Sequence, residues 1–194
     1  NGSEPQNELD LSLTAGQGGA DDHSNMTVDF GFFQTVSVGD YVWYDLNNNG
    51  QQDAGEPPVV GATVSLFNPN STNLSDKALG ESAAAIREMF NPNGTPVTDA
   101  TGNPVAPVTT NGTGNYSFTN LVPGDYYIAV NNPGYDPTPT NGGDVDANPS
   151  NTDNNGVNIS GVTTSLVFTL TTGGETGDGD ANANNNPSVD FGFI

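Results

Sequence analysis

Alternating apolar and polar positions predict short β-strands along most of the chain. The pattern is clearest over residues 36–44, where four apolar side chains fall on one face of an extended strand: Val36, Val38, Val42 and Tyr44. Further strands are predicted at 62–67, 116–118, 125–130, 165–170 and 189–193. Turn-forming residues separate these runs, and Pro123-Gly124 predicts a tight turn. Many short strands joined by turns are typical of an all-β sandwich, in which we expect Trp43 to be a buried core aromatic.

One segment departs from this pattern. Residues 75–90 are rich in helix formers, and their apolar residues recur at helical spacing at Leu79, Ala83, Ile86 and Phe90. Asn91-Pro92 ends the run. The sequence therefore predicts one short helix in an inserted segment, 69–90, that covers an edge or end of the sandwich. Both basic residues of the chain fall here, so a contact surface for an acidic neighbouring copy is the alternative.

Composition excludes several classes of function. The chain of 194 residues carries 23 acidic and 2 basic side chains, a formal charge of −21. Two basic residues cannot neutralise a row of phosphates, so we expect no nucleic-acid binding and no attraction to anionic membranes. No apolar run approaches the length of a membrane span, so no membrane insertion is expected.

The inventory of reactive side chains is equally restrictive. Cysteine is absent, which excludes disulfides and thiolate chemistry, and a single histidine, His23, excludes a multi-histidine metal centre. A Ser-His-Asp triad would have to use His23, which lies in a Gly/Asp-rich stretch typical of a solvated loop. We therefore expect no enzyme. Carboxylates, Asn carbonyls and glycines remain plentiful, and they suit a hard cation such as calcium.

Residues 45–56 match the twelve-residue calcium loop D-x-[DN]-x-[DN]-G-x5-E at every fixed position. The predicted ligands are Asp45, Asn47, Asn49, the backbone carbonyl of Gln51, Asp53 and Glu56. A predicted strand precedes the loop and two prolines follow it, so the helices of an EF-hand are absent. Such a loop predicts a stabilising Ca2+ and not a sensor, because no helix pair exists to open. A plain Asn-Gly hairpin loop is the alternative.

Other polar clusters are weaker candidates. Residues 144–156 place ligand-type side chains at alternate positions, and Asp144, Asp146 and Asp153 are predicted to bind a second calcium. A third cluster, 178–184, has similar spacing without a fixed template. Eight Asn-x-Ser/Thr sequons are candidate glycan sites, at Asn1, Asn25, Asn70, Asn73, Asn93, Asn111, Asn115 and Asn158.

Four stretches carry a family resemblance: VGDYVWYD at 38–45, NNNGQQDAGE at 47–56, the run 114–127, and VDFGF at 189–193. In this order they resemble the B-type repeats of the serine-aspartate-repeat adhesins of bacterial cell walls. The resemblance covers about residues 35–194. It implies an Ig-like, transthyretin-like β-sandwich, used in tandem as a calcium-stiffened stalk unit outside the cell, with the calcium ligands of the 45–56 loop.

Two departures from that family matter. The insertion at 69–90 is longer than the usual hairpin there. Related modules also form Lys–Asn isopeptide bonds, but the only lysine of this chain, Lys77, lies in the insertion, so we expect no such bond.

The N-terminus repeats the end of the module. Residues 11–16 resemble 168–173, and 28–33 resemble 189–194. We therefore predict that 1–33 are the last two strands of a preceding module, or strands donated to a neighbouring copy, and that 34–194 form the calcium-binding sandwich. Two strands alone are marginally stable and need a partner sheet. Either arrangement joins copies head-to-tail by strand complementation.

The leading hypothesis is therefore a structural module of a stalk, fibre or filament, at the cell surface or secreted, whose partners are further copies of itself and calcium. The alternative is an adhesive binding module that recognises a polysaccharide or a host protein. A cluster of exposed aromatic rings on one face would favour this alternative, because sugars stack on rings.

Overall fold

The computed structural model describes residues 31–69, 97–132, 134–139, 152–159 and 162–194. By its contacts the chain divides into two units, Asn1–Phe32 and Phe33–Ile194, and the fold described below is that of the second. The predicted helix at 75–90 and the predicted strands before residue 31 lie outside the described residues. Within the described ranges, no helix is long and apolar enough to cross a bilayer.

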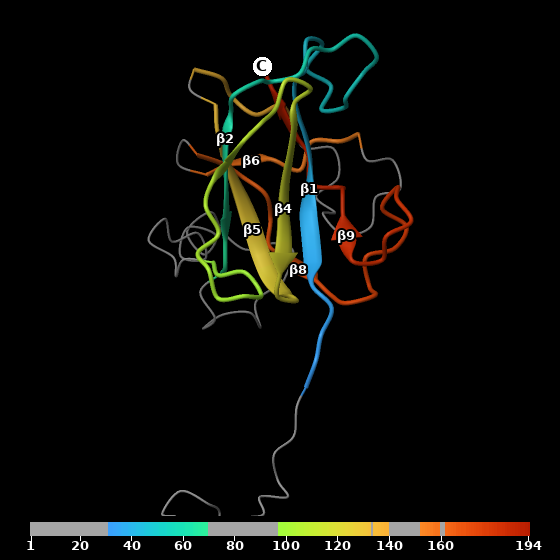
Figure 1. The fold of residues 1–194 in the computed structure, drawn as a ribbon. Coiled ribbons are helices and arrows are strands. Elements are labelled where there is room, and N and C mark those ends of the chain that lie inside the picture. Colours follow the sequence, from blue (N-terminus) through green and yellow to red (C-terminus); the bar gives the residue numbers. More distant parts are fainter. Residues whose placement is uncertain (1–30, 70–96, 133, 140–151, 160–161) are drawn as a thin grey trace, which may run out of the picture. The chain divides into compact units, whose positions relative to one another are not determined.

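In the described residues, ten strands form two sheets (Figure 1). The strands are β1 (Val36–Tyr44), β2 (Thr63–Phe67), β3 (Val108–Thr109), β4 (Asn115–Leu121), β5 (Gly124–Asn131), β6 (Val157–Ile159), β7 (Val162–Thr164), β8 (Phe168–Leu170), β9 (Asn185–Asn186) and β10 (Phe191–Phe193). One sheet has the order β10-β1-β4, with β9 also paired to β1. The other has the order β3-β2-β5-β7-β6, with β8 also paired to β5.

The longest strand, β1, organises the first sheet. It pairs antiparallel with β4 and parallel with both β9 and β10. The parallel pairing places β10 beside β1, the first of the described strands, so β10 ends next to the point where β1 runs into the 45–56 loop. The backbone N–H of Asp45 donates to the carbonyl of Phe193 at 2.9 Å, which fixes this junction.

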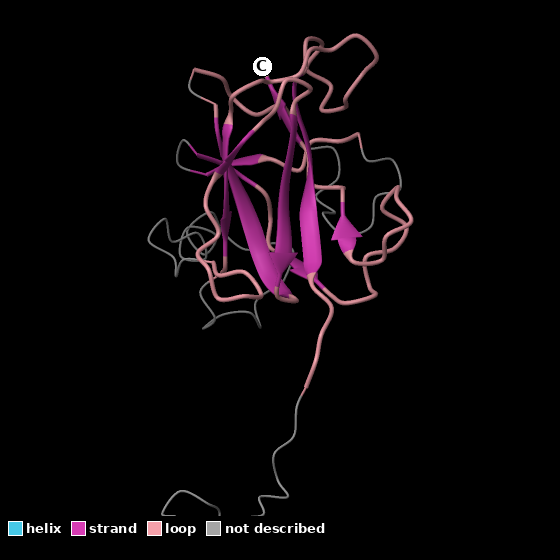
Figure 2. Cartoon of the chain, viewed as in Figure 1, coloured by secondary structure: helices cyan, strands magenta, loops and turns pink. Residues whose placement is uncertain are grey.

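The core lies between the two sheets. It is formed by buried apolar side chains from both of them, including Val38 and Phe118 from the first sheet and Val64 and Ile128 from the second. Figure 2 shows strands and loops throughout the described residues. The predicted all-β sandwich is therefore confirmed.

All six predicted strands are present in the described part of the chain; β1 has the predicted ends, and the ends of the other five are shifted. The tight turn at Pro123-Gly124 joins β4 to β5, but these strands belong to different sheets. The turn is thus an arch across the core and not a hairpin. Strands β3, β6, β7 and β9 have only two or three residues and were not predicted. Strands β8 and β10 are equally short, but they lie within the longer predicted runs 165–170 and 189–193.

Trp43 is fully buried, as predicted, but it lies outside the apolar cluster between the sheets. It pairs across the ladder with Gly192 of β10. A Cβ atom at residue 192 would lie 2.9 Å from Trp43 Cζ2 and 2.7 Å from Thr138 Oγ1. The absence of a side chain at Gly192 therefore makes room for the indole ring.

Candidate metal centre

The 45–56 loop follows β1 directly and begins with a buried carboxylate. Asp45 is 2% exposed, and its Oδ2 accepts a hydrogen bond of 2.7 Å from the N–H of Gly50. Its Oδ1 accepts one from the N–H of Asn49 at 3.2 Å. Gly50 has φ 75°, a left-handed conformation that favours glycine, so the loop turns here as the motif requires.

The other predicted ligands hold the loop closed. The side-chain amides of Asn47 and Asn49 donate to the same oxygen of Asp53, at 2.7 and 2.8 Å. The two oxygens of Glu56 accept from the N–H groups of Leu46 and Asp53, at 2.8 and 2.9 Å. The amide N–H groups thus give Asp53 the positive charge density that a cation would supply.

The donor set fits calcium in chemistry, since it offers only carboxylate, carboxamide and backbone oxygens. In the described part of the chain, however, no group of three or more Asp, Glu or His side chains converges closely enough to hold a metal ion. A cation would therefore have to turn the oxygens of Asn47 and Asn49 inward and draw Asp53 and Glu56 together.

The fold brings Asp153, from the second predicted cluster, beside this loop. Gln51 and Asp153 form an isolated antiparallel bridge. The N–H of Gln52 donates to the carbonyl of Thr152 at 2.6 Å, and that of Asn154 donates to the carbonyl of Gly50 at 2.9 Å. Asp153 is 3% exposed. No sequence pattern predicts that these two segments meet. Asp144 and Asp146, the other residues of the second predicted cluster, lie outside the described residues.

Two buried asparagines, Asn154 and Asn155, support this junction and were not among the predicted site residues. The Asn154 side chain donates to the carbonyl of Thr138 at 2.7 Å and accepts from the N–H of Gly192 at 3.1 Å. Asn155 Oδ1 accepts from the N–H of Asp190 at 2.7 Å. Because asparagine is common in every loop of this chain, composition alone could not single them out.

Asp190 is a buried carboxylate that the sequence placed only in a strand. It is 1% exposed, and its Oδ1 accepts a hydrogen bond from the N–H of Tyr41 at 2.9 Å. Its Oδ2 has no hydrogen-bond partner among the described residues. Burial raises the pKa of Asp190 well above its usual range, and the negative charges of Asp40 and Asp153 raise it further.

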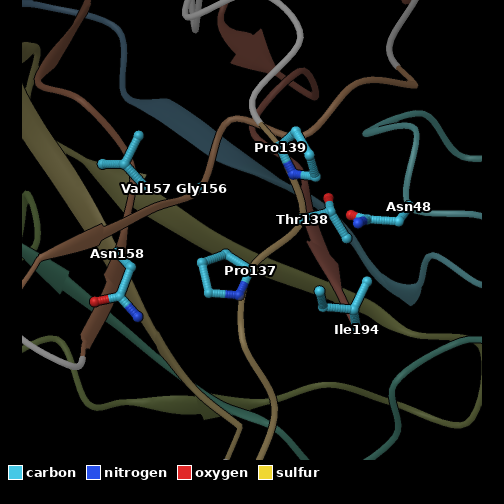
Figure 3. Close-up of a pocket in the computed structure, with 8 residues that line it drawn as sticks. All are labelled: Asn48, Pro137, Thr138, Pro139, Gly156, Val157, Asn158 and Ile194. Carbon is cyan, nitrogen blue, oxygen red and sulfur yellow. The ribbon is translucent and has the colours of Figure 1, made fainter.

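An open pocket of about 420 Å³ lies next to this region (Figure 3). Its lining is Asn48, Pro137, Thr138, Pro139, Gly156, Val157, Asn158 and Ile194. None of these eight side chains titrates near neutral pH, so the pocket offers no general acid or base.

Comparison with known proteins identifies the family. A family model described as the SdrD B-like domain matches residues 36–83 and 93–192. Serine-aspartate repeat-containing protein D of Staphylococcus aureus (strain Newman) is 33% identical over 163 residues, which cover 83% of this chain and 10% of that protein. Serine-aspartate repeat-containing protein F of Staphylococcus epidermidis is 33% identical over 142 residues, covering 72% of this chain and 6% of that protein. The chain thus spans a tenth or less of the length of these relatives, and it belongs to the SdrD B-like domain family.

Proposed function

We propose that the chain is a non-catalytic structural module of an extracellular protein, at the cell surface or in a secreted filament, and that calcium bound at the 45–56 loop stiffens it. The observation that carries this proposal is that the loop continues directly from β1 and is hydrogen-bonded to 152–154. An ion that orders the loop would therefore also restrain the end of β1 and residues 152–154, where β1 and β10 finish.

The charge of the chain supports a stabilising cation. The formal charge is −21, and the described residues contain neither lysine nor arginine, because Lys77 and Arg87 lie outside them. Mutual repulsion among carboxylates destabilises a compact state. A divalent ion held by Asp45, Asp53 and Glu56, with Asp153 beside them, would relieve part of that repulsion.

Thermal unfolding with calcium and with chelator tests the proposal. A ligand that binds only the folded state stabilises it by about 4 kcal/mol at a thousandfold excess over Kd. We expect chelator to lower the Tm of the full chain, and Glu56→Gln to remove most of the difference. The matched control is Asp136→Asn, which neutralises an exposed carboxylate outside the loop. Superimposed melting curves with calcium and chelator would contradict the proposal.

Assembly from repeated copies is part of the same proposal. The repeats of 168–173 and 189–194 within the first 33 residues support head-to-tail joining, through a preceding module or through donated strands. Further copies of the chain are then its main partners.

The adhesive alternative has less support. Among the described residues, the well-exposed aromatic rings are Phe32, Phe33 and Tyr135. The first two are adjacent in the sequence at the start of the module, and Tyr135 packs its ring on Tyr44 at 4.9 Å between centroids. This arrangement gives no broad aromatic platform on which a sugar could stack.

A further inference from the structure

Strand β4 lies at the margin of the first sheet, where β1 is its ladder partner on one side only. The N–H of Val42 donates to the carbonyl of Gly114 at 2.9 Å, so the even-numbered residues that follow direct their backbone groups to β1. The backbone groups of Ser117 and the N–H of Thr119 therefore point away from β1. Both residues are exposed.

Local contacts cover the two ends of this margin. At its start, the carbonyl of Asn115 accepts from the N–H of Asn111 at 3.0 Å. At its end, Leu121 forms an isolated bridge with Asp99. In the described part of the chain, no strand pairs with residues 116–119 on this side, and these residues are here called the free edge.

The free edge lacks the features that usually prevent a strand from being added. Proteins commonly protect an exposed edge with charged side chains or proline. Strand β4 contains neither. Residues 100–124 carry no charged side chain, although the chain has 23 acidic and 2 basic ones. An acidic partner could therefore approach this side of the module without meeting a carboxylate from 100–124.

The core is incompletely covered on the same side. Val105 and Val108 pack against it but are only partly buried. Val108 belongs to β3, which is the edge strand of the second sheet and contacts β4. An added strand with an apolar face would remove these two side chains from water, which is favourable.

Residues 9–14 have the alternation that such an added strand requires. This segment precedes the predicted joint to the sandwich. Every second residue is leucine, so an extended segment has one apolar face and one polar face, formed respectively by Leu9, Leu11 and Leu13 and by Asp10, Ser12 and Thr14. In strand addition, backbone hydrogen bonds provide affinity and alternate side chains provide specificity.

We propose that the free edge of β4 accepts residues 9–14 of a neighbouring copy as an added strand. The leucines face Val105 and Val108, and Ser12 lies on the same face as Ser117 and Thr119. The contact joins different surfaces of two copies, so it propagates as an open chain. This inference rests on the proposed head-to-tail assembly and identifies the surface that accepts the strand.

Disulfide formation between copies tests the pairing, because the full chain contains no cysteine of its own. Ser12→Cys chains are mixed in turn with Ser117→Cys and Thr119→Cys chains and oxidised. We expect a mixed disulfide with at least one of the two, because facing side chains on paired strands lie within reach of a disulfide. Val162→Cys is the matched control, since residue 162 is exposed on β7, on the other side of β5 from β2 and β3.

A proline at the free edge tests the role of the backbone. Ser117→Pro removes an N–H that points away from β1, so it leaves the β1–β4 ladder intact. We expect it to weaken association of the full chain in sedimentation by about tenfold or more. Ser117→Ala keeps the N–H, is the matched control, and should associate as the wild type does.

The inference is overturned if Ser12→Cys joins neither position of β4, if it joins Val162→Cys as readily, or if Ser117→Pro associates as tightly as Ser117→Ala. Association that survives Ser117→Pro would exclude the free edge and leave head-to-tail assembly intact. A full chain that stays monomeric at every concentration would overturn strand donation as well. The calcium dependence of Tm would still test the proposed structural module separately.

Discussion

At the scale of single residues, Asp190 is a carboxylic acid whose ionised form is disfavoured by complete burial and by neighbouring negative charges. The negative charges of Asp40 and Asp153 add to the effect of burial in raising its pKa. A raised folded-state pKa means that the native protein binds the proton more tightly than the unfolded chain. Its contribution to stability is therefore most favourable at low pH. It declines as pH rises from the ordinary value of 3.8 through the higher folded pKa.

We expect Asp190→Asn to remove this pH dependence. In calcium-free buffer the variant should melt at a higher temperature than the wild type at pH 8, because each unit of pKa shift corresponds to about 1.4 kcal/mol. The two proteins should converge at about pH 3, below the ordinary value of 3.8, where Asp190 is largely protonated in both states. Thermal melts across this range measure the effect. If the wild type melted below the variant by the same amount at both pH values, Asp190 would not be the source of the pH dependence.

Gly192 is a residue whose importance is steric. We expect Gly192→Ala to destabilise the fold by about 1–3 kcal/mol, the usual cost of overpacking, because the new methyl group would meet Trp43 and Thr138. Gly112→Ala is the matched control, since nothing lies within 4 Å of a Cβ at that position. Urea unfolding monitored by Trp43 fluorescence compares the two variants. Equal midpoints would show that the structure accommodates the new methyl group beside Trp43 and Thr138 without loss of stability.

At the scale of elements, the sequence was informative where a strand was long enough to show alternation. Strand β1 was predicted with its observed ends, Val36–Tyr44, whereas β9 has two residues and depends on pairing with β1. Pro123-Gly124 was recognised as a turn. That the chain crosses from one sheet to the other at this turn depends on which strands β4 and β5 pair with, and the local sequence does not show those partners.

The candidate site shows the same division. The 45–56 loop has a contiguous motif, so its residues could be named from the sequence. The approach of Asp153 to Gln51, and the burial of Asp178 and Asp190, depend on how distant segments pack. Such contacts have no signature in a chain where Asp and Asn are frequent in every loop.

The side chain of Asn154 pairs with backbone groups on both sides of the junction between 152–156 and β10. We expect Asn154→Ala to destabilise the fold by about 3 kcal/mol or more, because the buried groups that it pairs each lose a partner. Asn103→Ala is the control, since that exposed side chain donates only to Thr101 Oγ1 and should change stability by about 0.5 kcal/mol or less. Chemical denaturation measures both, and a similar loss in the two variants would refute a special role for Asn154.

At the scale of the whole molecule, the net charge of −21 dominates the response to salt. In calcium-free buffer we expect Tm to rise as NaCl increases from about 0.01 to 0.15 M, because the screening length falls from about 30 to 8 Å. Bound calcium neutralises part of the repulsion, so the rise should be smaller when calcium is saturating. Differential scanning calorimetry at the two salt concentrations tests this, and an equal rise with and without calcium would mean that bound calcium does not relieve the repulsion.

The described core comes entirely from residues after the predicted joint. Its first member is Val36 and its last is Phe193. We therefore expect a chain of residues 34–194 to fold with a Tm within about 2 °C of the full chain, since changes outside the core seldom alter stability by more than about 0.5 kcal/mol. If residues 1–33 donate strands to a neighbour, sedimentation will show concentration-dependent assembly of the full chain and a monomer after deletion. If they end a preceding module, both forms will be monomeric. A large fall in Tm on deletion would mean that residues 1–33 pack into their own sandwich, and the head-to-tail hypothesis would fail.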